Sequence, residues 1–242
     1  MRVANSVYVL PIPRRPENAD NHLNLTLIVD EENGTALVDT GLPDQTEAIS
    51  AALAEAGIGA RDLRLVILTH QDLDHVGSGA ALVRHSGARV LAHSADAPYI
   101  DGSRRPLKPS PEMLEQRPHM REILERREPV AVDEQVENGT RLDLAGGIQV
   151  VFTPGHTPGH ISLYLEESKV LVAGDALTAD RGYLNGPNPS VTLDMRTATQ
   201  SVKRLADLDV DTIVCYHGGV VSEDANGQLR RVIQEASRKR NE

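Results

Sequence analysis

The chain of 242 residues is long enough to bury one sizeable core, so we expect a single domain over residues 1–242, and its net charge of −10 argues against nucleic acid as a partner. The single cysteine, Cys215, excludes a disulfide framework and a cysteine-based zinc site. No signal-peptide core and no membrane-spanning apolar run is present, so a cytoplasmic protein without a membrane partner is expected.

The first predicted element is a β-hairpin. Two apolar runs, Leu27–Val29 and Ala36–Val38, flank an acidic turn, and the second run delivers Asp39 at its carboxyl end. A helix is predicted next, with Asp44 as its N-cap, apolar residues at helical spacing from 48 to 56, and Gly57 as its stop.

A dense cluster of polar residues follows the next predicted strand, Leu63–Leu68. Four potential metal ligands stand within six positions: His70, Asp72, Asp74 and His75. Imidazole and carboxylate are the groups that hold zinc, manganese or iron in proteins. Such a cluster is costly to bury unless a cation lies among the carboxylates. The pattern therefore predicts a metal site.

The composition changes after a short strand at Arg89–Leu91. The segment from Ser94 to Pro129 is rich in proline and basic residues, and a helix is expected to begin at Ser110-Pro111. Two interpretations fit this segment equally well. It is either a solvated surface helix, or a lid whose positive charges attract an anionic small-molecule substrate. The basic residues are Arg104, Arg105, Lys108, Arg117, Arg121, Arg126 and Arg127.

The second half of the chain repeats the pattern of a strand that leads into a ligand. A strand at Ile148–Phe152 leads to His156, a second hairpin (163–172) leads to Asp175, and a strand at Thr212–Cys215 leads to His217. Helices are predicted from about Asp194 and over Gln228–Ser237. The strand ends are expected to meet at one edge of the sheets. The two hairpins suggest two related halves.

Taken together, these motifs resemble the five motifs of the metallo-β-lactamase-fold hydrolases, in the family's order and over nearly the whole chain. The resemblance implies an α/β fold, a four-layer αββα sandwich, with a dinuclear metal site at one edge. By this resemblance one ion is held by His70, Asp72 and His156, the other by Asp74, His75 and His217, and Asp175 bridges them, while Asp39 orients ligands without binding metal. His160 either orients a ligand in the same way or starts a strand.

One residue departs from the commonest family pattern, which has histidine where this chain has Asp72, although some subgroups share the aspartate. Aspartate can ligate zinc but is a harder ligand and adds a negative charge. We expect two divalent ions, with zinc as the first choice of metal. The centre is expected to be a weaker Lewis acid than one with histidine at this position, and also to accept manganese or iron.

The resemblance implies a metal-dependent hydrolase in which a metal-bridging hydroxide cleaves a small ester, lactone or thioester. Asp74 is the expected catalytic residue, because it can pass a proton to the leaving group. The alternative is a metal-binding sensor or scaffold of the same fold with weak or no catalysis, which Asp72 motivates. His22 and Tyr183 either line the substrate pocket or have a surface or packing role.

Overall fold

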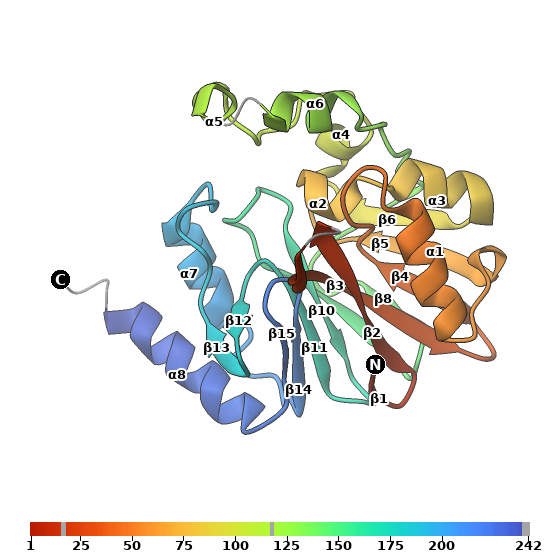
Figure 1. Ribbon diagram of the computed structural model, residues 1–242. Coiled ribbons are helices and arrows are strands. Elements are labelled where there is room, and N and C mark those ends of the chain that lie inside the picture. Colours follow the sequence, from red (N-terminus) through yellow and green to blue (C-terminus); the bar gives the residue numbers. More distant parts are fainter. Residues whose placement is uncertain (16–17, 117–118, 239–242) are drawn as a thin grey trace.

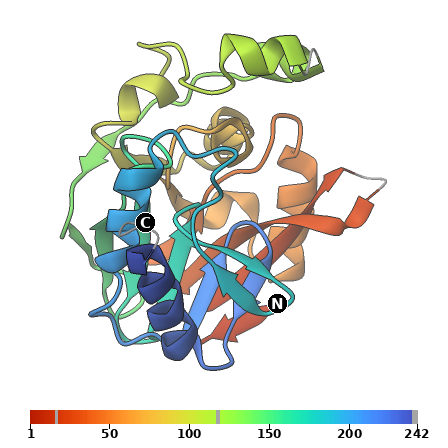
Figure 2. The same cartoon turned by 90° about the vertical axis from the view of Figure 1, so that its left-hand side faces the viewer.

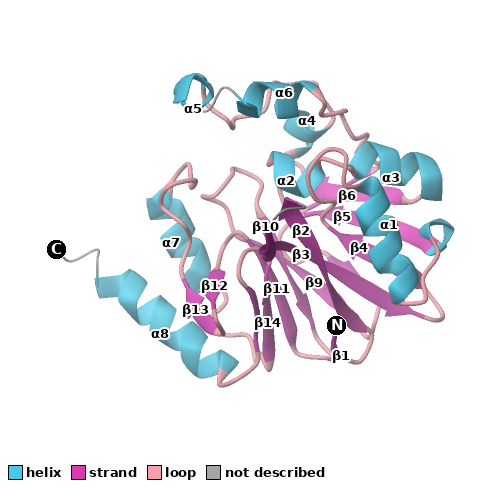
Figure 3. Cartoon of the chain, viewed as in Figure 1, coloured by secondary structure: helices cyan, strands magenta, loops and turns pink. Residues whose placement is uncertain are grey.

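The computed structural model describes residues 1–15, 18–116 and 119–238 and contains two β-sheets that face each other between two layers of helices (Figures 1 and 3). The first sheet consists, in spatial order, of β1 (Arg2–Ala4), β2 (Val7–Arg15), β3 (Asn18–Asp30), β4 (Gly34–Val38), β5 (Leu63–Leu68), β6 (Arg89–His93) and β7 (Glu134–Val136). Strands β1 to β4 pair antiparallel, whereas β4 to β7 pair parallel.

The second sheet has the spatial order β15-β14-β11-β10-β9-β8. Its strands are β8 (Arg141–Leu142), β9 (Ile148–Phe152), β10 (Ile161–Leu165), β11 (Val170–Gly174), β14 (Thr212–Cys215) and β15 (Gly219–Val221). Within it, β11 and β14 pair parallel, which brings the carboxyl ends of both to the same edge. A separate ribbon is formed by β12 (Thr178–Asp180) and β13 (Tyr183–Asn185).

Helices cover the outer face of each sheet. The first sheet is covered by α1 (Thr46–Glu55), the 3₁₀ turn η1 (Ala60–Asp62) and α3 (Gly79–Ser86), and the second by α7 (Met195–Lys203) and α8 (Ala225–Arg238), which stands in front of the sheet in Figure 2. The short helix α2 (Leu73–Val76) follows β5. In both views α4 (Ala97–Ile100), α5 (Pro111–Gln116) and α6 (His119–Glu125) lie above one end of the sheets.

Strand periodicity explains the layers. In β4, Leu37 packs against Ile49 and Leu53 of α1, whereas Ala36 and Val38 point to the interior between the two sheets. A third core lies between the second sheet and helices α7 and α8. Each fully buried Leu or Ile in these cores contributes about 2 kcal/mol through burial. The predicted four-layer αββα sandwich is confirmed.

The predicted elements agree with the structure except at helix ends. The strands at 63–68, 148–152 and 212–215 have the predicted bounds, and Asp194 caps α7 by accepting a hydrogen bond from the Thr197 amide at 3.0 Å. The prediction that Asp44 caps the first helix is wrong. Its backbone is left-handed (φ 68°), its carboxylate pairs with Arg126 at 3.1 Å, and Gln45 takes the N-cap position. Helix α8 begins at Ala225, three residues before the predicted Gln228.

No helix in the described ranges combines the length and the apolar character that a membrane crossing requires.

Asp30 connects the two sheets at the β3–β4 turn. Its carboxylate accepts hydrogen bonds from the amides of Asn33 at 2.9 Å and, across the molecule, of Ala145 at 2.7 Å, and these bonds lower its pKa from 3.8 to about 2. We expect Asp30→Ala to lower the free energy of unfolding by about 1 kcal/mol at neutral pH, since solvent weakens bonds to a carboxylate that is only partly buried.

The pH dependence of that loss follows from the direction of the pKa shift. A carboxyl whose pKa is lowered by folding stabilises the native state above its unfolded pKa, and this contribution is lost as pH falls through the folded value. The difference between the wild type and Asp30→Ala is thus expected to shrink between pH 3.8 and about 2 in urea unfolding. A difference that stays constant over this range would contradict the assignment.

Candidate metal centre

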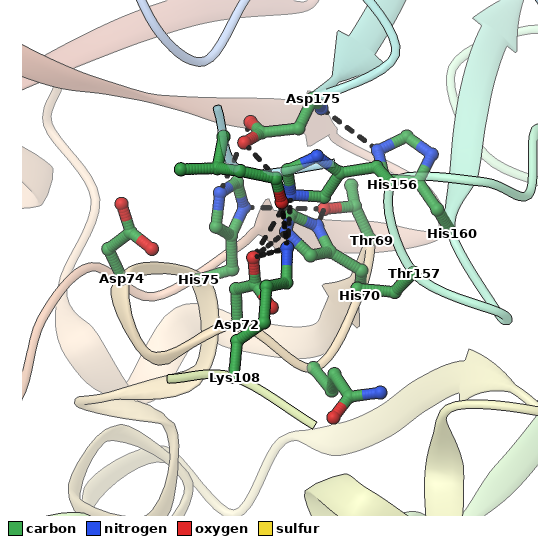
Figure 4. Close-up of polar contacts among 12 residues, drawn as sticks. Thr69, His70, Asp72, Asp74, His75, Lys108, His156, Thr157, His160 and Asp175 are labelled. Carbon is green, nitrogen blue, oxygen red and sulfur yellow. Dashed lines mark hydrogen bonds and ion pairs between the residues drawn. The ribbon is translucent and has the colours of Figure 1, made fainter. Parts of the chain in front are cut away.

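The seven predicted ligands come together at one end of the sandwich, in segments that follow strand ends. Figure 4 labels six of them, all except His217. The loop after β5 and the helix α2 supply His70, Asp72, Asp74 and His75, the β9–β10 loop supplies His156, the end of β11 supplies Asp175, and the β14–β15 turn supplies His217. A short bridge between Leu23 of β3 and His217 joins the two sheets at this edge.

The ligand atoms form two groups. Those of His70, His156 and Asp175 lie within 4.8 Å of one another, and so do those of Asp74, His75 and His217. Asp175 reaches both groups, because its Oδ2 lies 3.3 Å from His156 Nε2 and 3.5 Å from His217 Nε2. Asp72 Oδ2 adjoins the first group, 3.0 Å from His156 Nε2. The structure thus brings all seven residues of the predicted ligand set together.

Several of these atoms are buried with no hydrogen-bond partner among the described residues. They are His70 Nε2, Asp72 Oδ1, His75 Nε2 and Asp175 Oδ1, of which the last two lie 3.3 Å from each other without forming a hydrogen bond. A buried imidazole nitrogen or carboxylate oxygen without a partner is costly, and a divalent cation removes that cost by accepting the lone pair. Imidazole nitrogens and carboxylate oxygens also form the donor set that zinc, manganese and iron accept. The residues therefore fit divalent metal ions.

Asp39, at the end of β4, orients His75. The His75 Nδ1–H donates to Asp39 Oδ2 at 2.8 Å, while the amide of Thr69 donates to Asp39 Oδ1 at 2.8 Å. His75 is buried, which disfavours its charged form, but the carboxylates of Asp39 and Asp175 outweigh burial and raise its pKa well above 6.5. The bond to Nδ1 leaves Nε2 of His75 directed at the second ligand group.

His160, at the start of β10, positions Asp175. The backbone amide of Asp175 donates to His160 Nε2 at 2.9 Å, and His160 Nδ1 contacts Thr153 Oγ1 at 2.8 Å. Burial and the nearby His156 lower the pKa of His160 to about 3, so it stays neutral and keeps an acceptor nitrogen. Gly174 is required beside it, because a Cβ there would lie 2.6 Å from His160 Nε2 and its φ is 56°.

Burial and charge act in opposite directions on the carboxyl groups of Asp72 and Asp175. Burial opposes ionisation of Asp175, but His217, His75 and His156 outweigh it and hold the pKa of this carboxyl well below 3.8. The pKa of Asp72 is likewise lowered against the effect of burial, by His70, His156 and Lys108. Both carboxylates are therefore anionic at neutral pH.

Three contributors to the site were not predicted. Asp96, fully buried, accepts hydrogen bonds from Gln71 of the β5 loop and from Thr157 and Gly159 of the β9–β10 loop. Burial raises its pKa, and these hydrogen bonds oppose the rise. Arg14 of β2 lies 3.4 Å from Asp74 Oδ2. Lys108, predicted only as one charge of the basic segment, reaches Asp72 Oδ2 at 2.5 Å. A single sequence carries no motif for such contacts.

A cavity of about 340 Å³ opens over the ligands. Its lining combines Asp72, Asp74, His156, Asp175 and His217 with Arg14, Asn21, Leu73, Lys108, Pro109, Met113, Met120, Thr178, Asn188 and Val191. Met113 and Met120 come from α5 and α6, so the basic segment takes part in forming the cavity.

The two residues suggested for the pocket lie elsewhere. Tyr183 is 71 % exposed and lines a separate surface hollow with Arg181 and Gln228, so of the two roles considered for it the surface role agrees with the structure. His22 of β3 pairs with Pro13 of β2. It is not among the described residues that line the cavity, although its neighbour Asn21 is.

An αββα sandwich with histidines and aspartates gathered at one edge of its sheets defines the class of metal-binding proteins that have the metallo-β-lactamase fold. The chain belongs to the metallo-beta-lactamase superfamily, whose family model matches residues 21–217.

Similar proteins place it among metallo-hydrolases. A probable metallo-hydrolase of Bacillus subtilis, YflN, is 30 % identical over 204 residues, which cover 78 % of this chain and 76 % of the relative. A hydroxyacylglutathione hydrolase of Cereibacter sphaeroides is 32 % identical over 193 residues, 78 % of this chain and 59 % of that protein. The crystal structure of a metallo-beta-lactamase family protein from Thermus thermophilus has a TM-score of 0.76 and 27 % identity, covering 97 % of this chain and 80 % of that one.

Proposed function

We propose that this metallo-hydrolase cleaves a small ester, lactone or thioester with the help of two divalent metal ions. Zinc is the metal that we expect at both positions. The observation that carries the proposal is the convergence of seven histidines and aspartates, five of which line one cavity, with several buried atoms that have no hydrogen-bond partner among the described residues. The hydroxyacylglutathione hydrolases among the relatives favour a thioester as the first substrate class to examine.

The two ligand groups support a position for each metal ion. His70, Asp72 and His156 would hold one ion, Asp74, His75 and His217 the other, with Asp175 shared between them. Divalent ions in such a centre lower the pKa of water so that hydroxide is available near neutral pH, and they polarise the oxygen of the bond to be cleaved. Manganese or iron remains an alternative to zinc because Asp72 is a hard oxygen ligand.

The protein's own groups would orient the substrate and move the proton. Asp74 faces the cavity, its Oδ2 lies 3.5 Å from His217 Nε2, and it can hold a proton for the leaving group. Tyr216 fixes the Asp74 backbone through a short hydrogen bond from its hydroxyl to the Asp74 carbonyl. Arg14, 42 % exposed at the cavity, supplies a positive charge for an anionic small-molecule substrate.

The segment 94–129 would act as a lid within a single domain. Met113 and Met120 present flexible apolar side chains to the cavity from α5 and α6, opposite the polar floor. Closure of such a segment excludes water from the reacting bond. Its apolar wall suits the uncharged part of a substrate, and thioether side chains adapt to varied shapes.

Metal analysis combined with a substrate panel tests the proposal. We expect the zinc-loaded protein to hydrolyse at least one member of a panel of esters, lactones, thioesters and phosphodiesters. Asp74→Ala is expected to lower kcat about a hundredfold, the lower range of general acid catalysis. Asp209→Ala, which changes an exposed carboxylate paired with Lys169 away from the cavity, is the matched control and is expected to keep full activity.

Two outcomes would contradict this function. Turnover no greater than that of Asp74→Ala, in a protein that retains zinc, would favour a metal-binding sensor of the same fold. Failure to retain zinc, manganese or iron under any loading condition would remove both functions.

A further inference from the structure

Lys108 lies inside the first ligand group. Its side chain extends from the segment between α4 and α5 down to the floor of the cavity (Figure 4). Its Nζ lies 2.5 Å from Asp72 Oδ2, 3.0 Å from His156 Nε2 and 2.8 Å from the carbonyl oxygen of Val191. An ammonium group has three N–H donors and no acceptor, so these three contacts satisfy it completely. Lys108 is thus seated as a cation among metal ligands.

The hydrogen bonds around His156 assign its ring nitrogens. The Thr192 hydroxyl donates to the carbonyl of Asn188 at 2.7 Å, so its oxygen is free to accept from His156 Nδ1, 3.3 Å away. With the hydrogen on Nδ1, the lone pair is on Nε2. That lone pair faces Asp72 Oδ2 at 3.0 Å, which is an acceptor as well. Two acceptors this close need a cation between them, and Lys108 supplies it.

We propose that Lys108 and a metal ion at the first position exclude each other, so that Lys108 regulates how many ions the centre holds. An imidazole nitrogen has one lone pair, and His156 Nε2 cannot both accept a hydrogen bond from Lys108 and bind a metal. An ammonium and a divalent ion sharing Asp72 would also repel each other strongly in this enclosed place. The second group, Asp74, His75 and His217, has no contact with Lys108 among those described and stays available.

The same geometry accounts for aspartate at position 72. Histidine there would offer a neutral ring to Lys108, whereas aspartate offers a negative charge that balances the ammonium. The segment that carries Lys108 is fixed to the ligand loop, because the Leu107 amide donates to Gln71 Oε1 at 2.9 Å and Gln71 Nε2 contacts Asp96 Oδ1 at 3.3 Å. Withdrawal of Lys108 therefore requires its side chain, or this segment, to move away from the cavity floor.

This inference rests on the proposed metal centre, and zinc binding tests it without an activity assay. Wild type, Lys108→Met and Lys169→Met are titrated with Zn²⁺ against a chromophoric chelator, and the ions per chain are counted by native mass spectrometry. Methionine keeps the apolar length of the side chain and removes the charge. Lys169 is the matched control, since it pairs with Asp209 at 2.6 Å on the surface.

We expect the wild type and Lys169→Met to hold one zinc ion tightly and a second at least tenfold more weakly. In Lys108→Met the second ion is expected to bind at least tenfold more tightly than in the wild type. Retention of the tightly held ion shows that the variant is folded. If methionine disrupts the fold, Lys108→Gln replaces Lys108→Met, and it is also expected to bind the second zinc ion more tightly than the wild type.

A change of less than threefold in the affinity for the second ion would overturn the role of Lys108. Two equally tight ions in the wild type would overturn it as well, while leaving the proposed function in place. If neither the wild type nor any variant retains zinc, the metal centre itself fails, and this inference fails with it.

Discussion

Asp175→Asn is expected to lower kcat/KM by about a thousandfold or more on any substrate that the wild type hydrolyses. This loss exceeds the roughly 10–100-fold loss that follows mutation of residues that only orient metal ligands. Among the carboxylates that the structure describes, Asp175 reaches both ligand groups, through His156 at 3.3 Å and His217 at 3.5 Å. An amide keeps the shape of the side chain and loses the negative charge that two cations would share. We therefore expect weaker binding of both ions.

Zinc content separates this loss from a folding defect. Asp175→Asn is expected to retain fewer zinc ions per chain than the wild type after dialysis, while its circular dichroism spectrum is unchanged. Asp180→Asn is the control, because it alters an exposed carboxylate beside Arg181 and lies only a few residues after Asp175 in the chain. Its zinc content and activity are expected to match those of the wild type. An Asp175→Asn protein with full zinc content and full activity would show that Asp175 does not join the two positions.

The sequence predicts the ligand cluster well because strand ends carry it. The apolar run 63–68 and the ligands that follow it are adjacent in the chain, so both the strand and its exit are visible in one short window. His156, Asp175 and His217 each follow a recognisable strand in the same way. Parallel pairing of β4 with β5 and of β11 with β14 then carries these ends to one edge, which a pattern of strands and helices can anticipate.

Contacts between distant segments could not be predicted in this way. Lys108 and Val191 are far apart in sequence, and the hydrogen bond between them depends on how the basic segment folds over the cavity. Tyr183 is a related case, because its pocket and surface roles could not be separated from the sequence. It follows Asp175 closely in the chain, but it belongs to the β12–β13 ribbon and is exposed to solvent. Proximity in sequence is a poor guide wherever a loop forms its own hydrogen-bonded structure.

Helix starts were missed where backbone geometry overrides residue preference. Asp44 is a good capping residue by type, but an N-cap requires an extended or similar backbone, and Asp44 adopts a left-handed conformation. The tight approach of Gly77 to the backbone of Pro43 fixes this turn, since a Cβ on Gly77 would lie 2.2 Å from the Pro43 nitrogen. The capping rule is correct at Asp194, whose backbone is extended (φ −134°, ψ 92°).

Asp96→Asn is expected to lower the free energy of unfolding by about 3 kcal/mol, because it removes two hydrogen bonds and places donors against donors in a buried site. Asp96 Oδ2 accepts from the Gln71 amide at 2.9 Å and from the Thr157 hydroxyl at 2.6 Å. Asp96 Oδ1 accepts from the Gly159 amide at 2.7 Å and from Gln71 Nε2 at 3.3 Å. Whichever way the asparagine amide turns, its NH₂ group meets two of these donors.

The same substitution is expected to weaken zinc binding, although Asp96 is not among the proposed ligands. Gln71 lies between His70 and Asp72, and Thr157 follows His156, so Asp96 holds the two loops of the first ligand group in register. We expect about a tenfold loss of zinc affinity there, in the range for groups that orient ligands.

Urea unfolding of the metal-free protein separates the two effects, because the loss of stability must appear without zinc. Asp101→Asn provides the comparison, since Asp101 is exposed in the same segment and accepts a hydrogen bond from the Ser103 amide at 2.8 Å. Its effect is expected to stay within about 0.5 kcal/mol, as for most surface substitutions. An Asp96→Asn variant as stable as Asp101→Asn would mean that the two ligand loops are held by their own strands, and that Asp96 adds nothing to the register of the site.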